Sequence, residues 1–145
     1  MSLVSVLIPV RNAAATLDEA LASIARQSVD DWEAVVVDDG SVDETPALLA
    51  EWARRDRRFR VIRNETGLGL VESLNRAAAL ATAPVLARMD ADDISLPTRF
   101  ERQLARLAEG DVAAVGCGVR YFPESLMAGG ALRYEAWLNS LVTPE

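Results

Sequence analysis

The chain has 145 residues, half of them apolar, which is enough for one compact domain with a continuous hydrophobic core. All fifteen basic residues are arginine, and there is no histidine and only one cysteine, which excludes a Ser-His-Asp triad, histidine-ligated zinc, a Walker-type lysine and an intrachain disulfide. The formal net charge of −7 argues against nucleic-acid binding, because phosphate affinity needs a basic face.

Apolar runs and amphipathic segments alternate along the chain. A strand predicted over residues 4–9 is followed by a helix with its apolar stripe at Leu17, Leu21 and Ile24, and then by a strand over 33–38. A second helix begins at a capping box, residues 41–44. A strand over 60–63, a helix near residues 71–78, a strand over 84–89 and a helix after Pro97 follow. This alternation predicts an α/β fold, a Rossmann-like and mostly parallel sheet flanked by helices.

The end of the chain gives weaker signals. Residues 112–115 and 119–122 are candidate strands, whereas the apolar residues from Pro123 onward have no clear partner. We therefore expect an α/β domain over residues 1–122 and a tail over 123–145. Cys117 is expected to be a buried structural thiol. The arginine cluster at 54–60 complements the end of a helix, with a docking patch for an anionic partner as the alternative.

Polar side chains follow each predicted strand, and three carboxylates come directly after the last one, in the stretch "RMDADDISLP". In open α/β sheets the ligand site lies beyond the carboxyl ends of the strands. Crowded aspartates repel one another unless a cation arrives, and oxygen ligands favour Mg²⁺ or Mn²⁺. In an extended segment Asp90 and Asp92 would share one face. The alternative is that these residues cap a helix or lie in a solvated loop.

Four segments, in this order and at this spacing, resemble the donor-binding half of a family 2 glycosyltransferase with the GT-A fold: "VSVLIPVRN", "VVVDDGSVDET", "VIRNETGLG" and "RMDADDISLPTRFERQ". The resemblance implies transfer of a sugar from a nucleoside diphosphate sugar to an acceptor hydroxyl, with inversion and with Mg²⁺ or Mn²⁺. It favours a UDP- or dTDP-sugar and a role in surface polysaccharide or glycolipid synthesis, on a saccharide or lipid-linked acceptor.

The resemblance also implies roles for individual residues. Pro9 and Asn12 would border the nucleobase, and Asp39 would hydrogen-bond it. Arg11 stands where the family often has an aromatic residue, and its guanidinium can stack on a base. The remaining implied positions are Asn64 and Gly67 near the donor, Asp90 at the ribose or metal, Asp92 as principal metal ligand and Asp93 in support. For Gly67 the alternative is a turn that requires a positive φ angle.

The general base of such enzymes lies well beyond the Asp-x-Asp motif, so we expect it after residue 145 and regard the chain as a piece of a longer protein. One alternative is a fragment that binds nucleotide and metal without turnover, and another is a sugar-nucleotidyltransferase-like enzyme. A dinucleotide-binding protein is disfavoured because "PVRNAAATL" lacks the glycine-rich turn. With no signal peptide and no run long enough to span a bilayer, the expected location is cytoplasmic, with possible peripheral association at the inner face of the membrane.

Overall fold

The structure, a computed structural model, describes residues 2–141, which divide into two compact units after Phe100. This division falls near the start of a helix, and the expected boundary at residue 122 remains a prediction. The first unit contains four strands and three helices and ends in the first turn of a fourth helix. They are β1 (Val4–Val10), α1 (Leu17–Ala25), β2 (Trp32–Asp38), α2 (Thr45–Arg55), β3 (Phe59–Arg63), α3 (Leu70–Leu80), β4 (Val85–Arg88) and α4 (Arg99–Ala108).

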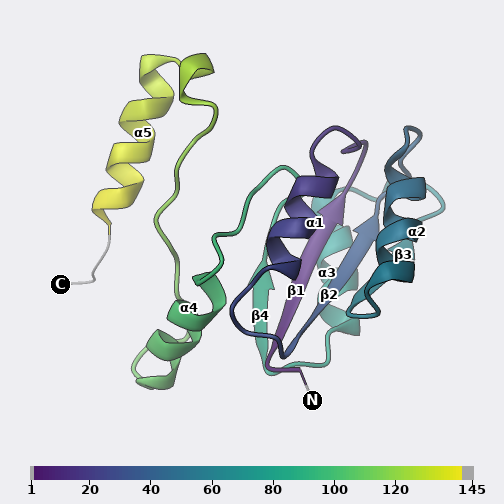
Figure 1. Ribbon diagram of the computed structural model, residues 1–145, viewed down its shortest axis with the longest axis horizontal. Helices are drawn as coiled ribbons and strands as arrows, with labels where there is room; N and C mark the ends of the chain where they lie inside the picture. Colours follow the sequence, from purple (N-terminus) through teal and green to yellow (C-terminus); the bar gives the residue numbers. More distant parts are fainter. Residues whose placement is uncertain (1, 142–145) are drawn as a thin grey trace. The chain divides into compact units, whose positions relative to one another are not determined.

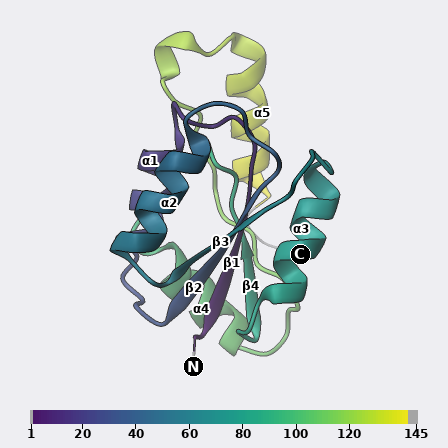
Figure 2. The ribbon, with the colours of Figure 1, turned by 90° about the vertical axis from the view of Figure 1, so that its right-hand side faces the viewer.

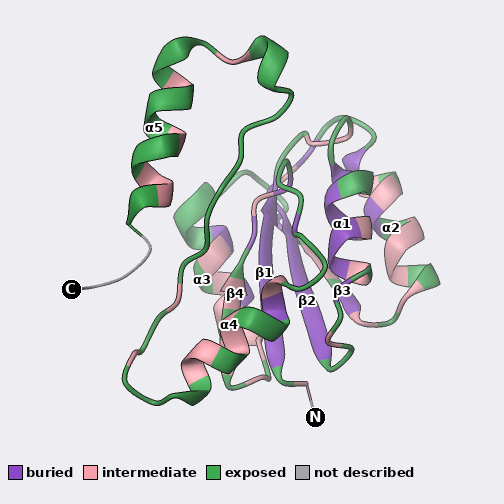
Figure 3. Ribbon diagram, turned by 60° about the vertical axis from the view of Figure 1, so that its left-hand side comes forward, coloured by how far each residue is buried: buried purple, intermediate pink, exposed green. Residues whose placement is uncertain are grey.

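The four strands form one parallel sheet in the order β3-β2-β1-β4. Helices α1 and α2 cover one face and α3 covers the other (Figures 1 and 2). Every residue of β1 and β2 is buried (Figure 3), as expected for central strands with helices on both sides. Beneath α3 the core contains Leu7, Val35, Val37 and Ala77. The predicted α/β fold class is therefore confirmed.

The predicted capping box at the start of α2 is wrong. Ser41 Oγ accepts a hydrogen bond from the backbone N–H of Asn12, so it does not cap the helix. Asp43 Oδ1 accepts the bond from Thr45 N–H instead, at 3.0 Å. Ser41 thus joins its loop to the loop after β1, and Asp43 Oδ2 does the same by accepting from Ala14 N–H at 3.1 Å.

The arginines at the far end of α2 agree with the helix-end interpretation. Arg54 and Arg55 lie in its last turn, where positive charge complements the helix dipole. Arg58 stacks over the Trp32 ring at 3.9 Å and pairs with Asp56 at 2.7 Å. Most charge in this cluster is locally balanced, which leaves little support for an anionic docking patch.

The second unit contains the rest of α4, a short 3-10 helix (Glu124–Leu126) and α5 (Gly129–Ser140). Within the described part of this unit, residues 112–115 and 119–122 form no strand, contrary to expectation. In residues 119–122, side chains of α5 take backbone groups that a strand would use. Asn139 bonds both the N–H and the C=O of Val119 at 2.7 Å, and Glu135 accepts from Tyr121 N–H at 2.7 Å.

The remaining expectations concern the single cysteine and a membrane-spanning helix. Cys117 is exposed, so the expectation of a buried thiol is wrong. The segment around it is irregular and encloses no core of its own. Among the helices over residues 2–141, none combines the length and the apolar character needed to cross a membrane.

Candidate functional site

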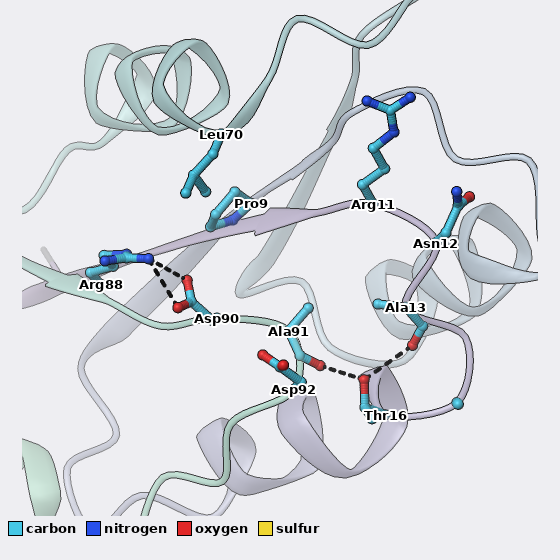
Figure 4. A pocket seen from close by; sticks show the side chains of 11 residues that line it. Pro9, Arg11, Asn12, Ala13, Thr16, Leu70, Arg88, Asp90, Ala91 and Asp92 are labelled. Atoms are coloured by element: carbon cyan, nitrogen blue, oxygen red, sulfur yellow. Dashed lines mark hydrogen bonds and ion pairs between the residues drawn. The ribbon is translucent and has the colours of Figure 1, made fainter. Parts of the chain in front are cut away.

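The sheet brings the ends of β1 and β4 together at the point where strand order reverses, since β2 and β3 lie on one side of β1 and β4 on the other. A cavity of about 460 Å³ opens there (Figure 4), within the range of about 300–1,000 Å³ common for small-molecule sites. This is the crevice in which open α/β sheets bind ligands. Its lining residues are Pro9, Arg11, Asn12, Ala13, Ala15, Thr16, Leu70, Arg88, Asp90, Ala91 and Asp92.

Hydrogen bonds to neighbouring loops fix the loop that follows β1. Asn12 has a positive φ of 50°, a conformation that asparagine tolerates better than most residues. Its N–H donates to Ser41 Oγ and its Oδ1 accepts from Val42 N–H, both at 2.9 Å. Thr16 Oγ1 donates to the carbonyl of Ala91 at 3.0 Å. The loops after β1, β2 and β4 therefore form one connected rim.

The carboxylates after β4 lie in a turn, not in the extended segment expected from the sequence. Asp93 N–H donates to the Asp90 carbonyl at 3.3 Å. Asp90 and Asp92 nevertheless both line the cavity. Burial and the neighbouring charges of Asp90 and Asp92 raise the pKa of Asp93, which is the electrostatic strain that a bound cation would relieve.

A buried side chain between α1 and β2 holds the segment that follows this turn. Gln27, which lies just beyond α1, donates from Nε2 to Ser95 Oγ at 3.1 Å and to the Leu96 carbonyl at 2.9 Å. Its Oε1 accepts from Phe100 N–H at 3.1 Å. The segment that follows the three aspartates is thereby held against the body of the first unit.

Asp38 and Asp39 have different environments. Asp38 is buried, and its Oδ1 accepts from Ser41 N–H at 2.9 Å while Oδ2 lies 3.4 Å from Arg63 Nη1. Asp39 is also buried, and it accepts from Leu68 N–H at 2.7 Å and from Gly69 N–H at 2.9 Å. The first therefore secures its own turn, and the second holds the loop that leads into α3.

Asp39 remains charged despite its burial. Burial acts to raise its pKa, but hydrogen bonds from Asn64, Leu68 and Gly69 outweigh that effect and lower the pKa to about 2. Asn64 donates from Nδ2 to Asp39 Oδ1 at 2.7 Å and accepts at Oδ1 from Arg76. Asp39 is thus a permanent acceptor near neutral pH.

Gly67 does not have the positive φ that a tight turn would require, so that interpretation is wrong; the positive-φ glycines of the described chain are Gly40, Gly69 and Gly110. A Cβ at Gly67 would lie 2.7 Å from Arg11 Nη1. Arg11 Nη1 is in turn 3.9 Å from Asp39 Oδ2. The small residue at position 67 lets the Arg11 side chain lie against the loop.

The structure thus places the predicted site residues in two adjoining groups. Five line the cavity: Pro9, Arg11, Asn12, Asp90 and Asp92. Asp39, Asn64 and Gly67 form a second group, which Arg11 joins to the first. Asp93 lies in the turn beside Asp90 and Asp92 without belonging to the cavity lining.

Sequence reasoning missed two polar residues of the cavity wall, Arg88 and Thr16. Arg88 is the last residue of β4, and its position at a strand end, two residues before Asp90, was a signal that could have found it. Thr16 had no such signal, because its bond to Ala91 joins residues 75 apart in the chain.

The donor set suits a hard divalent cation that is shared with a ligand. Among residues 2–141, no three His, Cys, Asp or Glu side chains gather closely enough to hold a metal by themselves. Mg²⁺ is commonly bound through one or two carboxylates together with substrate phosphates and waters. Asp92 and Asp90, on one wall of a cavity with room for such a ligand, fit that arrangement.

Comparison with known proteins gives a consistent family match. The model of "Glycosyl transferase family 2" matches residues 5–140. An uncharacterized glycosyltransferase of Haemophilus influenzae is 37% identical over 115 residues, 79% of this chain and 36% of that protein. The Escherichia coli protein WfgD, named as a UDP-Glc:alpha-D-GlcNAc-diphosphoundecaprenol beta-1,3-glucosyltransferase, is 30% identical over 77% of this chain and 43% of its own length.

Among solved structures, the mannosyltransferase PcManGT of Pyrobaculum calidifontis, in complex with GDP-Man and Mn²⁺, is similar with a TM-score of 0.75 and 31% identity. The match covers 81% of this chain and 36% of that one. The chain therefore spans less than half the length of each of these three proteins.

Proposed function

Since the chain belongs to glycosyl transferase family 2, we propose that it binds the nucleoside diphosphate sugar of a glycosyltransferase and presents the sugar to an acceptor hydroxyl for transfer with inversion. A UDP- or dTDP-sugar is the favoured donor. The acceptor is a saccharide or a lipid-linked saccharide, met at the inner face of the membrane. The name of the E. coli relative, which contains a UDP-sugar and a diphosphoundecaprenol acceptor, supports this choice.

One observation carries the proposal: the carboxylates of the turn after β4 and the polar side chains of the loop after β1 line the same cavity, at the reversal point of a parallel sheet. That crevice takes nucleotides in other open α/β sheets. Asp92 and Asp90 face it from one wall, and Arg11, Asn12 and Pro9 border it from another (Figure 4). A nucleoside diphosphate matches both walls, since its diphosphate can share a cation with the aspartates and its flat base can lie against the other wall.

In the proposed complex each group of residues has a distinct task. Pro9, Asn12 and Arg11 border the base, with the Arg11 guanidinium stacked on it. Asp39 accepts a hydrogen bond from the base, and Asn64 and Gly67 shape the adjoining loop. Because its pKa is about 2, Asp39 offers this acceptor throughout the physiological pH range.

Asp92 and Asp90 would hold Mg²⁺ or Mn²⁺, with Asp93 in support. When bound, the metal would neutralise the negative charge that grows on the departing diphosphate. We assign no general base. The late carboxylates of the described chain are already paired in the second unit: Asp111 with Arg106, Glu124 with Arg120, and Glu135 with the N–H of Tyr121.

The test is calorimetric titration of the chain with UDP, dTDP and GDP, each with Mn²⁺ and again with EDTA. We expect metal-dependent binding of one nucleoside diphosphate. Asp92→Asn should abolish that dependence while circular dichroism stays unchanged. Asp31→Asn, at an exposed residue just before β2, is the matched control. Donor affinity that is the same with Mn²⁺ and EDTA, or the same in Asp92→Asn, would contradict the metal assignment.

A second candidate is a module that binds nucleotide and metal without transferring sugar, since Asp111, Glu124 and Glu135 are each engaged by another group. The two functions differ in release of nucleoside diphosphate from the donor. Release that depends on added acceptor supports transfer, whereas tight binding with no release in a longer protein that contains this chain supports the binding module.

A further inference from the structure

Arg88 is a cation in the cavity wall to which the proposed function gives no task. It ends β4 and pairs in register with Leu7 of β1. Because paired residues of neighbouring strands point to the same face and Leu7 packs toward α3, Arg88 is on the α3 face of the sheet. It lies there beside Pro9 and Leu70, at the mouth of the cavity (Figure 4).

The guanidinium of Arg88 is bound to the carboxylate of Asp90. Nη2 donates to Oδ1 and to Oδ2, both at 2.9 Å. Of the hydrogen bonds between described residues, those of this guanidinium all come from Nη2. An arginine side chain has five N–H donors in a planar fork that matches phosphate oxygens, so most of its donor capacity remains for a ligand.

The pair places Arg88 in competition with a metal ion. A cation that binds Asp90 must share or displace the guanidinium, since both need the same carboxylate oxygens. The pair is accessible, with the two side chains 56% and 42% exposed, and exposed ion pairs are weak enough to exchange. A nucleoside diphosphate, in turn, carries more negative charge than one divalent cation neutralises, so a released guanidinium would have a partner within the cavity.

We propose that Arg88 changes partner when a nucleoside diphosphate occupies the cavity: its guanidinium leaves Asp90 and binds the terminal phosphate of the nucleoside diphosphate, and Asp90 becomes free for the metal or ribose. This inference rests on the proposed function. It makes Arg88 a phosphate-binding residue that otherwise serves as the counter-ion of Asp90. The alternative is that Arg88 only positions Asp90.

Partner exchange predicts that Arg88→Gln strengthens the binding of Mn²⁺ alone and weakens the binding of UDP. Without its competitor, Asp90 should bind Mn²⁺ alone more tightly, by about threefold for an exposed pair. UDP in the presence of Mn²⁺ should bind about tenfold more weakly, because a charge-assisted bond to phosphate is lost. UMP, which lacks the terminal phosphate, should change by less than about twofold. A residue that only positions Asp90 would weaken the binding of all three.

The experiment measures free Mn²⁺ by electron paramagnetic resonance and nucleotide binding by calorimetry. Arg57→Gln is the matched control, since Arg57 is exposed and precedes β3 at the opposite end of the sheet. In an Asp90→Asn background, Arg88→Gln should leave Mn²⁺ affinity unchanged and still weaken UDP binding.

Loss of the UDP effect in that background, or a parallel loss of Mn²⁺ and UDP affinity in the single variant, would overturn the partner exchange. Equal UDP affinity of the wild-type chain and Arg88→Gln would overturn this inference alone. Wild-type chain that binds neither Mn²⁺ nor UDP would overturn the proposed function as well.

Discussion

Glu33 is a buried carboxylate at the end of the sheet opposite the cavity, and its replacement by glutamine tests how the first unit is held together. Its Oε1 accepts from Ser5 Oγ and from both the N–H and the hydroxyl of Thr82, all at 2.7 Å. Its Oε2 accepts from Arg60 Nη1 at 3.0 Å. The carboxylate thus joins β1, β2, β3 and the loop before β4.

The size of the effect follows from the pKa of Glu33. Burial acts to raise this pKa, but the hydrogen bonds from Thr82, Ser5 and Arg60 lower it from 4.5 to about 2. At ~1.4 kcal/mol per pKa unit, that fall corresponds to about 3 kcal/mol in favour of the charged form. Arg60 is 42% exposed, so solvent screens part of the interaction, and we expect Glu33→Gln to lose about 2 kcal/mol at pH 7.

The loss should depend on pH in one direction. A carboxylate with a lowered native pKa contributes its full stability above the unfolded value of 4.5 and loses it as pH falls toward 2. Urea denaturation, followed by tryptophan fluorescence, should therefore show a difference between wild type and Glu33→Gln of about 2 kcal/mol at pH 7 and about 1 kcal/mol at pH 3. Glu51→Gln, at an exposed pair with Arg55, should cost no more than about 0.5 kcal/mol. The same difference for Glu33→Gln at both pH values would refute the reasoning.

Three other substitutions give independent checks. Asp39→Ala should weaken UDP binding more than pyrophosphate binding, because the base contact is lost and the diphosphate contact is not; equal losses in calorimetry would move Asp39 out of the base site. Gly40→Ala should destabilise the first unit by about 2 kcal/mol in urea denaturation, since φ is +72° and the new Cβ would lie 3.1 Å from Gly67 N; an unchanged midpoint would contradict this. Gln27→Ala should lower the free energy of unfolding by about 2 kcal/mol, because its buried hydrogen bonds are lost. It should also weaken Mn²⁺-dependent UDP binding. A loss of stability without a loss of affinity would show that the aspartate turn does not need this support.

The regular elements were predictable because burial fixes their pattern. The predicted strand over 33–38 begins one residue later than β2 and ends with it. The predicted strand over 60–63 likewise begins one residue later than β3 and ends with it. Parallel strands buried on both faces, such as β2, read as continuous apolar runs, so their limits are visible in the sequence. The order β3-β2-β1-β4 is not visible there, because it depends on which edge each crossover returns to.

The failures come from hydrogen bonds between distant parts of the chain. Ser41 has the sequence context of a helix cap but bonds Asn12, and Val119 has the context of a strand but is bonded by Asn139. In the candidate site, Asp90 and Asp92 reach the same cavity through a turn, although the sequence suggested an extended segment. Residue type and position at strand ends indicated which side chains gather at this edge of the sheet, while the partner of each polar group was a property of the fold.

The bonds that Asp39 accepts from Leu68 and Gly69 have a consequence for binding kinetics. A nucleobase that takes its place at this carboxylate competes with main-chain amides of the same molecule, and the release of those amides is a unimolecular step. If binding waits for that step, the observed rate in stopped flow will level off as nucleotide concentration rises, and the plateau will equal the opening rate of the loop. A rate that stays linear in concentration would mean that the base finds an acceptor position on Asp39 which the loop leaves accessible.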